Sequence, residues 1–169
     1  MPNIEKVLNA NVYIDGNNFL GKAREVRLPT VSVQKTEHRP LGTFATIALP
    51  QGIERMEIGI IFETFNADAF KRTNPFSAVN LTIRAVQQEY DAHGNLVTNK
   101  QVRVYAKGSF RSAELGNVTA QESGTRTLTF DLNYYKLEIA GQVIHEIDPL
   151  NSIYIVNGKD LLATARTML

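Results

Sequence analysis

The residue types that most often do chemistry gather at one place in this sequence, His145-Glu146-Ile147-Asp148. Imidazole and carboxylate groups at such short spacing are typical of metal-binding sites. The segment alternates like a β-strand, however, and successive side chains of a strand point to opposite faces. His145 would therefore point away from Glu146 and Asp148, and the three groups would not converge on one ion. We expect no metal site here.

Other catalytic arrangements are equally hard to build. His38 and His93 lie in turn-like segments without partners at metal-ligand spacing. Glu57 and Glu63 share one face of a predicted strand, but six residues of strand put them about 20 Å apart, too far for the carboxylate pair of a glycosidase. No GxGxxG or GxSxG motif is present. We therefore expect no catalytic residue, no cofactor and no enzyme.

Composition narrows the class of protein. The chain has 169 residues, is 43% hydrophobic and 21% charged, and carries a net charge of +1. This is typical of one folded domain, and the charge balance argues against a nucleic-acid binder, which needs a clustered basic surface. There is no cysteine. The first residues lack the apolar core of a secretion signal, so we expect a chain made in a cytoplasm and not inserted into a membrane.

The elements that must position these residues are predicted to be strands. Alternating apolar and polar residues dominate, with turn signals such as Asp15-Gly16 and residues 91–95 between the runs. Helical signals are few. Asn66 can cap a short helix over 66–73, and Asn157, with Asp160 three residues later, can cap another at the C-terminus. The sequence therefore predicts a mainly β single domain over 1–169, an antiparallel β-barrel or sandwich with one or two short helices.

One predicted strand changes its apolar face halfway along. Leu128, Phe130, Leu132 and Tyr134 alternate on one face, and then Leu137 and Ile139 continue on the other. A flat strand cannot bury both sets on one side. Two interpretations fit the slip near Tyr134-Tyr135: a bulge that inserts one residue, or a bend by which the strand passes from one sheet to another.

The other face of this strand is small and polar. It carries Thr127, Thr129 and Asp131 rather than the long charged side chains that usually cover an outer strand. Such a face is compatible with ordinary exposure to solvent. It is also compatible with the lining of a water-filled channel, where bulky side chains would block the passage of other molecules.

The two ends of the chain resemble a known family. Residues 11–21, 28–29 and 35–37, followed near the end by 134–138, 146–151 and 156–160, look like the major tail tube protein of contractile-tailed phages (myoviruses) and of R-type pyocins, which are phage tails without heads. The resemblance covers roughly the first and last quarters of the chain, in the expected order. The glycine-rich turn that the family often has after the Lys-Thr-Glu segment is replaced here by residues 39–42.

The resemblance implies a tail-tube type protomer. Six copies would close into a homohexameric ring, with one sheet of each copy joining its neighbours around a lumen. Stacked rings would form the inner tube of a contractile tail, a conduit for DNA ejection or membrane puncture. A strand that serves both the protomer core and the ring wall would explain the change of face, because its two halves meet different neighbours.

The resemblance also implies candidate site residues and partners. A polar lumen would be lined by Glu57, Glu63, Thr127, Thr129 and Asp131. Contacts between rings would be made by the N-terminal arm (about 1–10) and by a hairpin over 31–49 that carries Lys35, Glu37, Arg39 and Leu41. The partners would be the chain itself, the tail sheath protein, the baseplate hub, the tail terminator, and a tape measure protein or DNA in the lumen. The protein would reside in a virion tail assembled in the bacterial host cytoplasm, or in a released contractile bacteriocin particle.

Two other functions remain open at this level. One is the tube of a bacterial device that delivers a toxin or effector protein, which sequence separates poorly from a phage tail. The other is a β-sandwich binding module, for which an exposed aromatic cluster or a carboxylate-rich calcium loop would be expected; the chain has no tryptophan and its tyrosines are scattered except for Tyr134-Tyr135.

Overall fold

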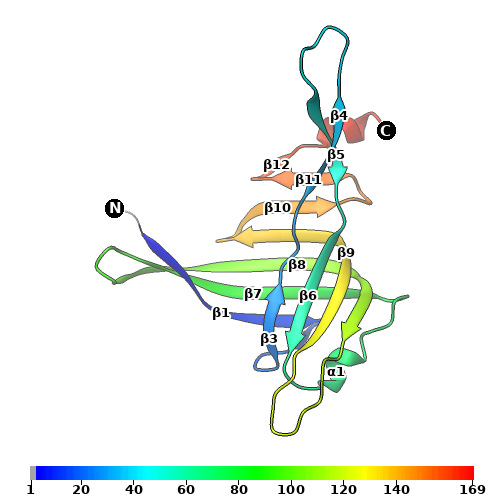
Figure 1. Ribbon diagram of the computed structural model, residues 1–169. Coiled ribbons are helices and arrows are strands. Elements are labelled where there is room, and N and C mark those ends of the chain that lie inside the picture. Colours follow the sequence, from blue (N-terminus) through cyan, green and yellow to red (C-terminus); the bar gives the residue numbers. More distant parts are fainter. Residues whose placement is uncertain (1–2) are drawn as a thin grey trace.

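The computed structural model describes residues 3–169, and strands make up most of it (Figure 1). The strands are β1 (Ile4–Ile14), β2 (Asn17–Asn18), β3 (Ala23–Arg27), β4 (Val33–His38), β5 (Ile47–Ile53), β6 (Met56–Phe62), β7 (Ala78–Tyr90), β8 (Leu96–Glu114), β9 (Arg126–Ile139), β10 (Gln142–Asp148), β11 (Ile153–Val156) and β12 (Lys159–Asp160). The helices are α1 (Ala67–Phe70) and α2 (Ala163–Thr167). All strand pairs are antiparallel, so the predicted mainly β fold with two short helices is confirmed.

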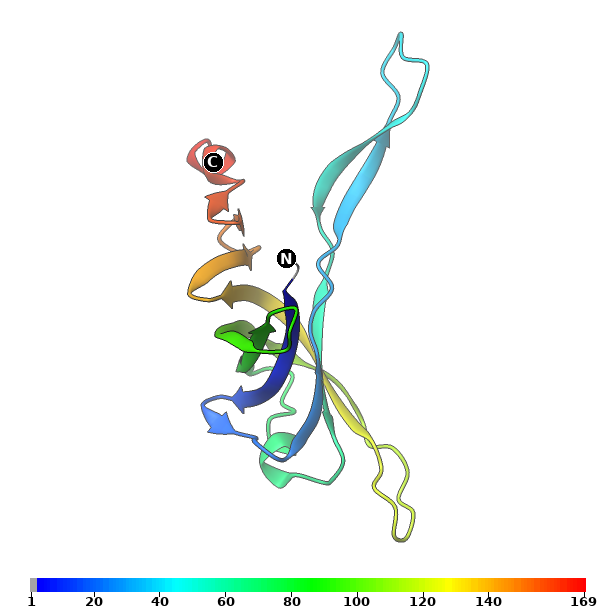
Figure 2. The same cartoon turned by 90° about the vertical axis from the view of Figure 1, so that its left-hand side faces the viewer.

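The strands form two layers that share β8 and β9 (Figure 2). In the back layer the order is β2-β1-β7-β8-β9-β10-β11-β12, and in the front layer β3 pairs with β6 and β6 with β9. Residues 126–132 of β9 pair with β6, whereas residues 135–139 pair with β10. The two layers are therefore one continuous sheet folded over on itself.

The core fills the space between the layers. Phe19, Phe62 and Phe130 are its largest fully buried side chains, and the rings of Phe19 and Phe62 meet edge to face with centroids 6.0 Å apart. Each such side chain contributes about 2–3 kcal/mol by leaving water. The alternating apolar residues of β6, β7 and β9 point into this core, which explains the period of two in their sequences.

The predicted change of face in β9 is confirmed, and both of its explanations apply. Leu132 lies opposite Gly108 and Tyr134 lies opposite Lys107, so Asn133 is an extra residue without a partner. After this bulge the buried set continues with Tyr135. The strand passes from the front layer to the back layer at the same point. A side chain at position 108 would not fit, because a Cβ there would lie 1.9 Å from the carbonyl oxygen of Asp131.

Two tight turns follow the sequence signals with one difference. Asp15 and Gly16 both have positive φ, 48° and 83°, as a two-residue turn between antiparallel strands requires. The Ala140-Gly141 turn has the same form, with φ of 51° and 80°. The left-handed conformation is routine for Gly141 and uncommon for an alanine. The hairpin geometry imposes it on Ala140 as well, at a cost of roughly 1 kcal/mol.

Both predicted helices are present, and the cap of the second differs from the prediction. Asn66 caps α1, because its side-chain oxygen accepts hydrogen bonds from the backbone N–H groups of Asp68 and Ala69. A C-terminal helix is present as predicted, but its cap at Asn157 was predicted wrongly. Asn157 has φ 50° and lies in the turn between β11 and β12. Helix α2 begins six residues later and buries none of its residues. The helical spacing of apolar residues in this segment therefore does not reflect packing against the core.

The two segments predicted to contact other rings differ in how far they leave the layered body. The β4–β5 hairpin stands out at one end, and every residue of β4 in it is exposed (Figure 2). It continues four residues beyond the predicted 31–49 because Val33 pairs with Ile53. Of the N-terminal arm predicted over 1–10, residues 1–2 lie outside the described residues. Residues 4–10 form the first part of β1, paired with β7.

Candidate functional site

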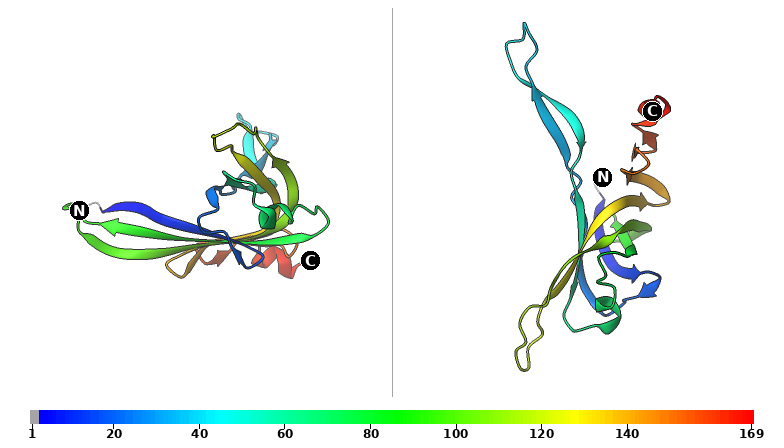
Figure 3. Two further views of the ribbon diagram at one scale, coloured as in Figure 1. Left: turned by 90° about the horizontal axis from the view of Figure 1, so that it is seen from below. Right: turned by 90° about the vertical axis from the view of Figure 1, so that its right-hand side faces the viewer.

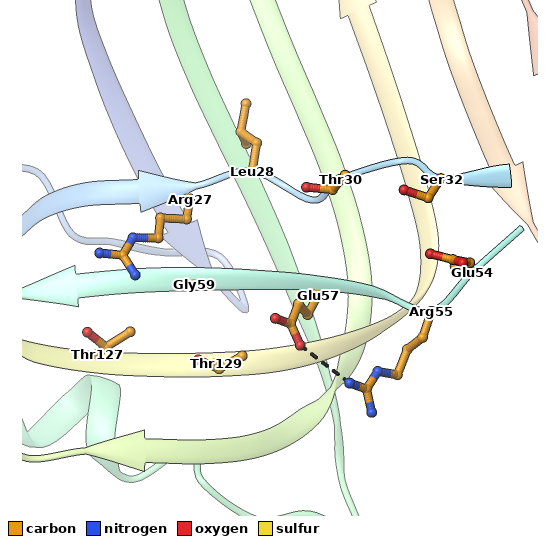
Figure 4. Close-up of a pocket in the computed structure, with 10 residues that line it drawn as sticks. All are labelled: Arg27, Leu28, Thr30, Ser32, Glu54, Arg55, Glu57, Gly59, Thr127 and Thr129. Atoms are coloured by element: carbon orange, nitrogen blue, oxygen red, sulfur yellow. Dashed lines mark ion pairs between the residues drawn. The ribbon is translucent and has the colours of Figure 1, made fainter. Parts of the chain in front are cut away.

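The face of the front layer that points away from the core is polar, and three strands build it. Glu57 on β6 lies directly opposite Asp131 on β9, and Thr127 and Thr129 alternate with the buried residues of β9 as Asp131 does. Figure 4 shows Glu57 and the two threonines. Gly59 of β6 lies opposite Thr129, between Glu57 and the end of the strand. The structure thus brings four of the five predicted lumen residues onto one surface, which we call the front face.

Two arginines neutralise the two carboxylates of the front face. Arg111 Nη1 lies 2.5 Å from Glu57 Oε2 and 3.3 Å from Asp131 Oδ1. Arg55 completes the set, 3.7 Å from Glu57 and 3.6 Å from Asp131. Like charges directly across a strand pair are destabilising, so the arginines relieve the repulsion between the two acids. All four side chains are partly exposed, and each pair contributes at most about 1 kcal/mol.

The fifth predicted lumen residue lies apart from this group. Glu63 follows the end of β6 and contacts Arg24 instead, with 3.4 Å between Arg24 Nη1 and Glu63 Oε1. Sequence reasoning found the acids of this surface but missed Arg55 and Arg111. The alternation of β6 and β9 indicated the acids, whereas the arginines come from the residue before β6 and from the irregular end of β8, where no periodic signal marks them.

An open hollow lies beside the ion pairs. It is lined by polar side chains and small groups of β3, β6, β9 and the chain leaving β3 (Figure 4), namely Arg27, Leu28, Thr30, Ser32, Glu54, Arg55, Glu57, Gly59, Thr127 and Thr129. Within residues 3–169 no group of three metal-ligating side chains is close enough to hold an ion. The surface can present hydroxyl, carboxylate and guanidinium groups to a passing molecule, and it has no enclosed cavity in which to retain one.

The histidine segment and one glycine motif have structural explanations. His145 lies in the strand β10, as predicted, and its neighbour Glu146 accepts a hydrogen bond of 3.0 Å from the hydroxyl of Tyr134. Burial, and then this hydrogen bond, raise the pKa of Tyr134. Residues 16–22 match the GxxxxGK spacing of a phosphate-binding loop, but that loop must connect a strand to a helix. Here the segment contains β2 and leads into β3.

The predicted inter-ring residues all lie on the projecting hairpin. Lys35 and Glu37 are exposed residues of β4, and Arg39 and Leu41 follow in the loop at its tip. Leu41 and Phe44 are completely exposed at this tip. Phe44 was missed by sequence reasoning, although an aromatic residue near Leu41 in a predicted turn is itself a signal.

Two strand edges of the front layer have no partner among residues 3–169. β3 pairs only with β6. On the opposite side, β7 begins at Ala78, which pairs with Ser109, so the last part of β8 (residues 110–114) pairs with β9 alone. We call these the β3 edge and the β8 edge. Each leaves backbone N–H and C=O groups unpaired within the protomer.

The comparison with protein families decides the identity. The sequence profile of the family "Phage tail tube protein FII" matches residues 4–169, nearly the whole chain. The chain belongs to this family. It is also 26% identical over 156 residues to the "Major tail tube protein" of Serratia phage KSP20, which covers 89% of this chain and 86% of that protein. The resemblance read from the two ends of the sequence is thereby confirmed.

Solved structures show the same fold. One chain of the sheath–tube complex of the extracellular contractile injection system PVC, in its extended state, matches with a TM-score of 0.56 at 13% identity, over 76% of this chain and 87% of that one. A chain of the sheath/tube terminator of the same system matches with a TM-score of 0.55 at 13% identity, over 76% and 92%. The protein is a structural component of a tail tube. No helix within residues 3–169 is long and apolar enough to cross a membrane.

Proposed function

We propose that copies of this tail tube protein join edge to edge into a closed hexameric ring, and that the rings stack into the inner tube of a contractile tail. The observation that carries the proposal is the pair of unpaired edges on the front layer. The β3 edge of one copy and the β8 edge of the next supply each other's missing hydrogen bonds. An interface between two different edges that closes after a fixed rotation gives a ring.

The charges on the β3 edge favour pairing with one matching edge over indiscriminate pairing. Arg24, Glu25 and Arg27 occupy three of its five positions. Charged residues on an exposed strand edge discourage indiscriminate pairing with other chains. Such an edge raises the protein concentration at which protomers pair unaided, and below that concentration an existing ring that presents the matching edge provides the template for growth.

In the ring the front face lines the lumen. Glu57 and Asp131 are matched by Arg55 and Arg111, so this set carries no net charge. Protein binds DNA tightly when clustered cations displace counterions from the phosphates. A charge-balanced wall offers no such gain, and DNA slides past it. The same surface suits an extended tape measure protein, which fills the lumen before ejection.

Further partners follow from the shape of the protomer. The hairpin β4–β5, with Lys35, Glu37, Arg39 and Leu41, reaches the adjacent ring, because it projects from one end of the body (Figure 2). The back layer, opposite the lumen, faces the tail sheath protein. The baseplate hub and the tail terminator contact the first and last rings. Likeness to chains in a sheath–tube complex and in a tube terminator supports this arrangement, and it supports a location in the tail of a virion or of a related contractile particle.

Cysteine cross-linking tests the ring directly, because the native chain has no cysteine. The variant with Glu25→Cys and Ser112→Cys carries one thiol on each edge. With a short bis-maleimide, assembled protein is expected to give a ladder of covalent oligomers that ends at six. Each single variant can only form dimers or remain monomeric. The pair Glu25→Cys with Asn151→Cys, which places the second thiol in an exposed turn, is the matched control. Tubes that form without any edge-specific ladder would refute the proposal.

A further inference from the structure

A second lateral feature accompanies the β3 edge. Residues 4–7 of β1, 86–90 of β7 and 96–100 of β8 form a three-stranded extension, the lateral blade, which leaves the body as a single layer (Figures 1 and 3). Ile4, Val7, Leu96 and Val97 on it are 62%, 57%, 49% and 56% exposed. A small sheet without a packed face is marginally stable in water.

Ion pairs hold the blade together without covering its apolar groups. Lys100 Nζ lies 2.7 Å from Glu89 Oε2 and 3.1 Å from Glu5 Oε1, so one cation links all three strands. The side chain of Asn3 donates a further hydrogen bond of 2.5 Å to Glu89. These contacts fix the register of the strands. They therefore present the exposed apolar side chains on a preformed surface rather than on a fraying end.

The opposite side of the protomer carries an exposed aromatic residue. Phe76, 96% exposed, sits in the turn that leads into β7. β7 has thirteen residues, about 43 Å of strand. The blade contains one end of β7 and Phe76 precedes the other, so these two apolar surfaces lie on opposite sides of the molecule.

Each apolar surface lies beside one of the two free edges. The blade projects on the side of the β3 edge, as the front and lower views agree (Figures 1 and 3). Phe76 lies next to the β8 edge. Ala78, two residues after Phe76, pairs with Ser109, and the β8 edge begins at the next residue of β8. The rotation that joins the β3 edge to the next copy's β8 edge therefore also carries the blade toward that copy's Phe76.

We propose that the lateral blade docks on the next copy of this chain in the ring and covers the surface around its Phe76. This rests on the proposed ring, and it assigns residues 4–7 to a contact within the ring, where the resemblance implied a contact between rings. The partner of the blade is a second copy of this chain, because the blade lies beside the β3 edge and the Phe76 surface lies beside the β8 edge. Pairing of these two edges brings the blade and the Phe76 surface together. In this interface the β3 and β8 edges of the front layers contribute backbone hydrogen bonds. The blade contributes the apolar contact that these hydrogen bonds alone would not supply.

Mixed cross-linking tests the contact and its direction. Val97→Cys protein mixed with Phe76→Cys protein, assembled and treated with a short bis-maleimide, is expected to give heterodimers and no longer species. The double variant with both substitutions is expected to give a ladder. The pair Val97→Cys with Leu150→Cys is the control, since Leu150 is 82% exposed in the turn between β10 and β11. If Glu25→Cys with Ser112→Cys cross-links while the blade pair does not, the docking is wrong and the ring stands. If neither pair cross-links in assembled protein, both are wrong.

Charge substitutions give an independent measure. Phe76→Asp, and Leu96→Asp combined with Val97→Asp, should each raise the protein concentration needed for tube formation about tenfold or more, as expected for loss of a central apolar contact. Leu150→Asp should leave it unchanged. Circular dichroism checks that all variants are folded. Folded Phe76→Asp protein that forms tubes at the wild-type concentration would overturn the docking.

Discussion

At the scale of single residues, the sharpest constraint is at Gly108, where the sheet folds over. Gly108→Ala is expected to destabilise the protein by about 3 kcal/mol or more, because the added Cβ would meet the backbone carbonyl of Asp131, which cannot move aside without breaking the bulge. Chemical denaturation measures this change in the free energy of unfolding. Gly52→Ala is the control, since a Cβ there meets nothing within 4 Å. An unchanged midpoint for Gly108→Ala would contradict the role given to the bulge.

The threonines of the front face test the lumen assignment. Thr127→Lys combined with Thr129→Lys would add a cluster of uncompensated cations to the wall, and phosphates would bind it. We expect particles built from this variant to have normal tubes but delayed or incomplete DNA delivery. Thr164→Lys with Thr167→Lys adds the same charge on the exposed helix α2. Normal delivery by the Thr127 and Thr129 variant would place this face outside the lumen.

At the scale of elements, the lateral blade should respond to acid. The hydrogen bond from Lys100, followed by that from Asn3, lowers the pKa of Glu89 below the ordinary value of 4.5. A lowered pKa stabilises the folded blade above the ordinary pKa, and the stabilisation is lost as pH falls through the lowered value. Amide exchange of residues 86–100 should therefore rise, relative to that of the core, between about pH 5 and pH 3.

Two variants make the acid test specific. In Glu89→Gln, amide exchange of residues 86–100 should be fast already at neutral pH. Its rate relative to that of the core should no longer rise between about pH 5 and pH 3. Glu122→Gln, in the loop between β8 and β9, should behave as wild type. An acid response in Glu89→Gln equal to that of the wild type would show that other groups of the blade cause it.

The β4–β5 hairpin should matter for stacking and not for the ring. Deleting residues 37–42 removes its exposed tip, including Leu41, but none of the core. We expect this variant to give the Glu25→Cys and Ser112→Cys cross-link ladder in single rings that do not form long tubes under the electron microscope. Phe44→Asp should weaken stacking in the same direction. Long, regular tubes from the deletion variant would exclude the hairpin as the inter-ring contact.

Local patterns account for most of what the sequence predicted correctly. The slip in β9, the Asp15-Gly16 turn and the Asn66 cap each depend on residues within a few positions of one another, and the structure has all three. Asn157 failed as a cap because the strand pairing of residues 153–160 outweighed a helical signal without a core to bury.

The front face could be predicted only in part, for the same reason. Glu57 and Asp131 were identified from alternation within their strands. Their direct opposition, and their arginine partners, depend on the register between strands and on the irregular end of β8, which no local pattern encodes. The two free edges are likewise a property of topology, because the β8 edge exists only where β8 runs on past Ser109, the partner of the first residue of β7.

At the scale of the whole molecule, the proposed assembly predicts particles rather than dispersed monomers. Purified protein at rising concentration should form rings or tubes in negative stain, with masses that step by one hexamer in mass photometry. The physical reason is that each ring makes several contacts with the next at once, so individually weak contacts suffice. Monomers alone at high concentration, with the fold intact, would contradict the proposed ring.

The hairpin leaves the body at one end, whereas the loop over residues 115–125 leaves it at the other (Figure 2). A column of such rings is therefore directional, with chemically different extremities. Two different proteins are therefore needed to start and to stop the growth of the column. One must bind the end that presents the hairpin tips, and the other must bind the end that receives them.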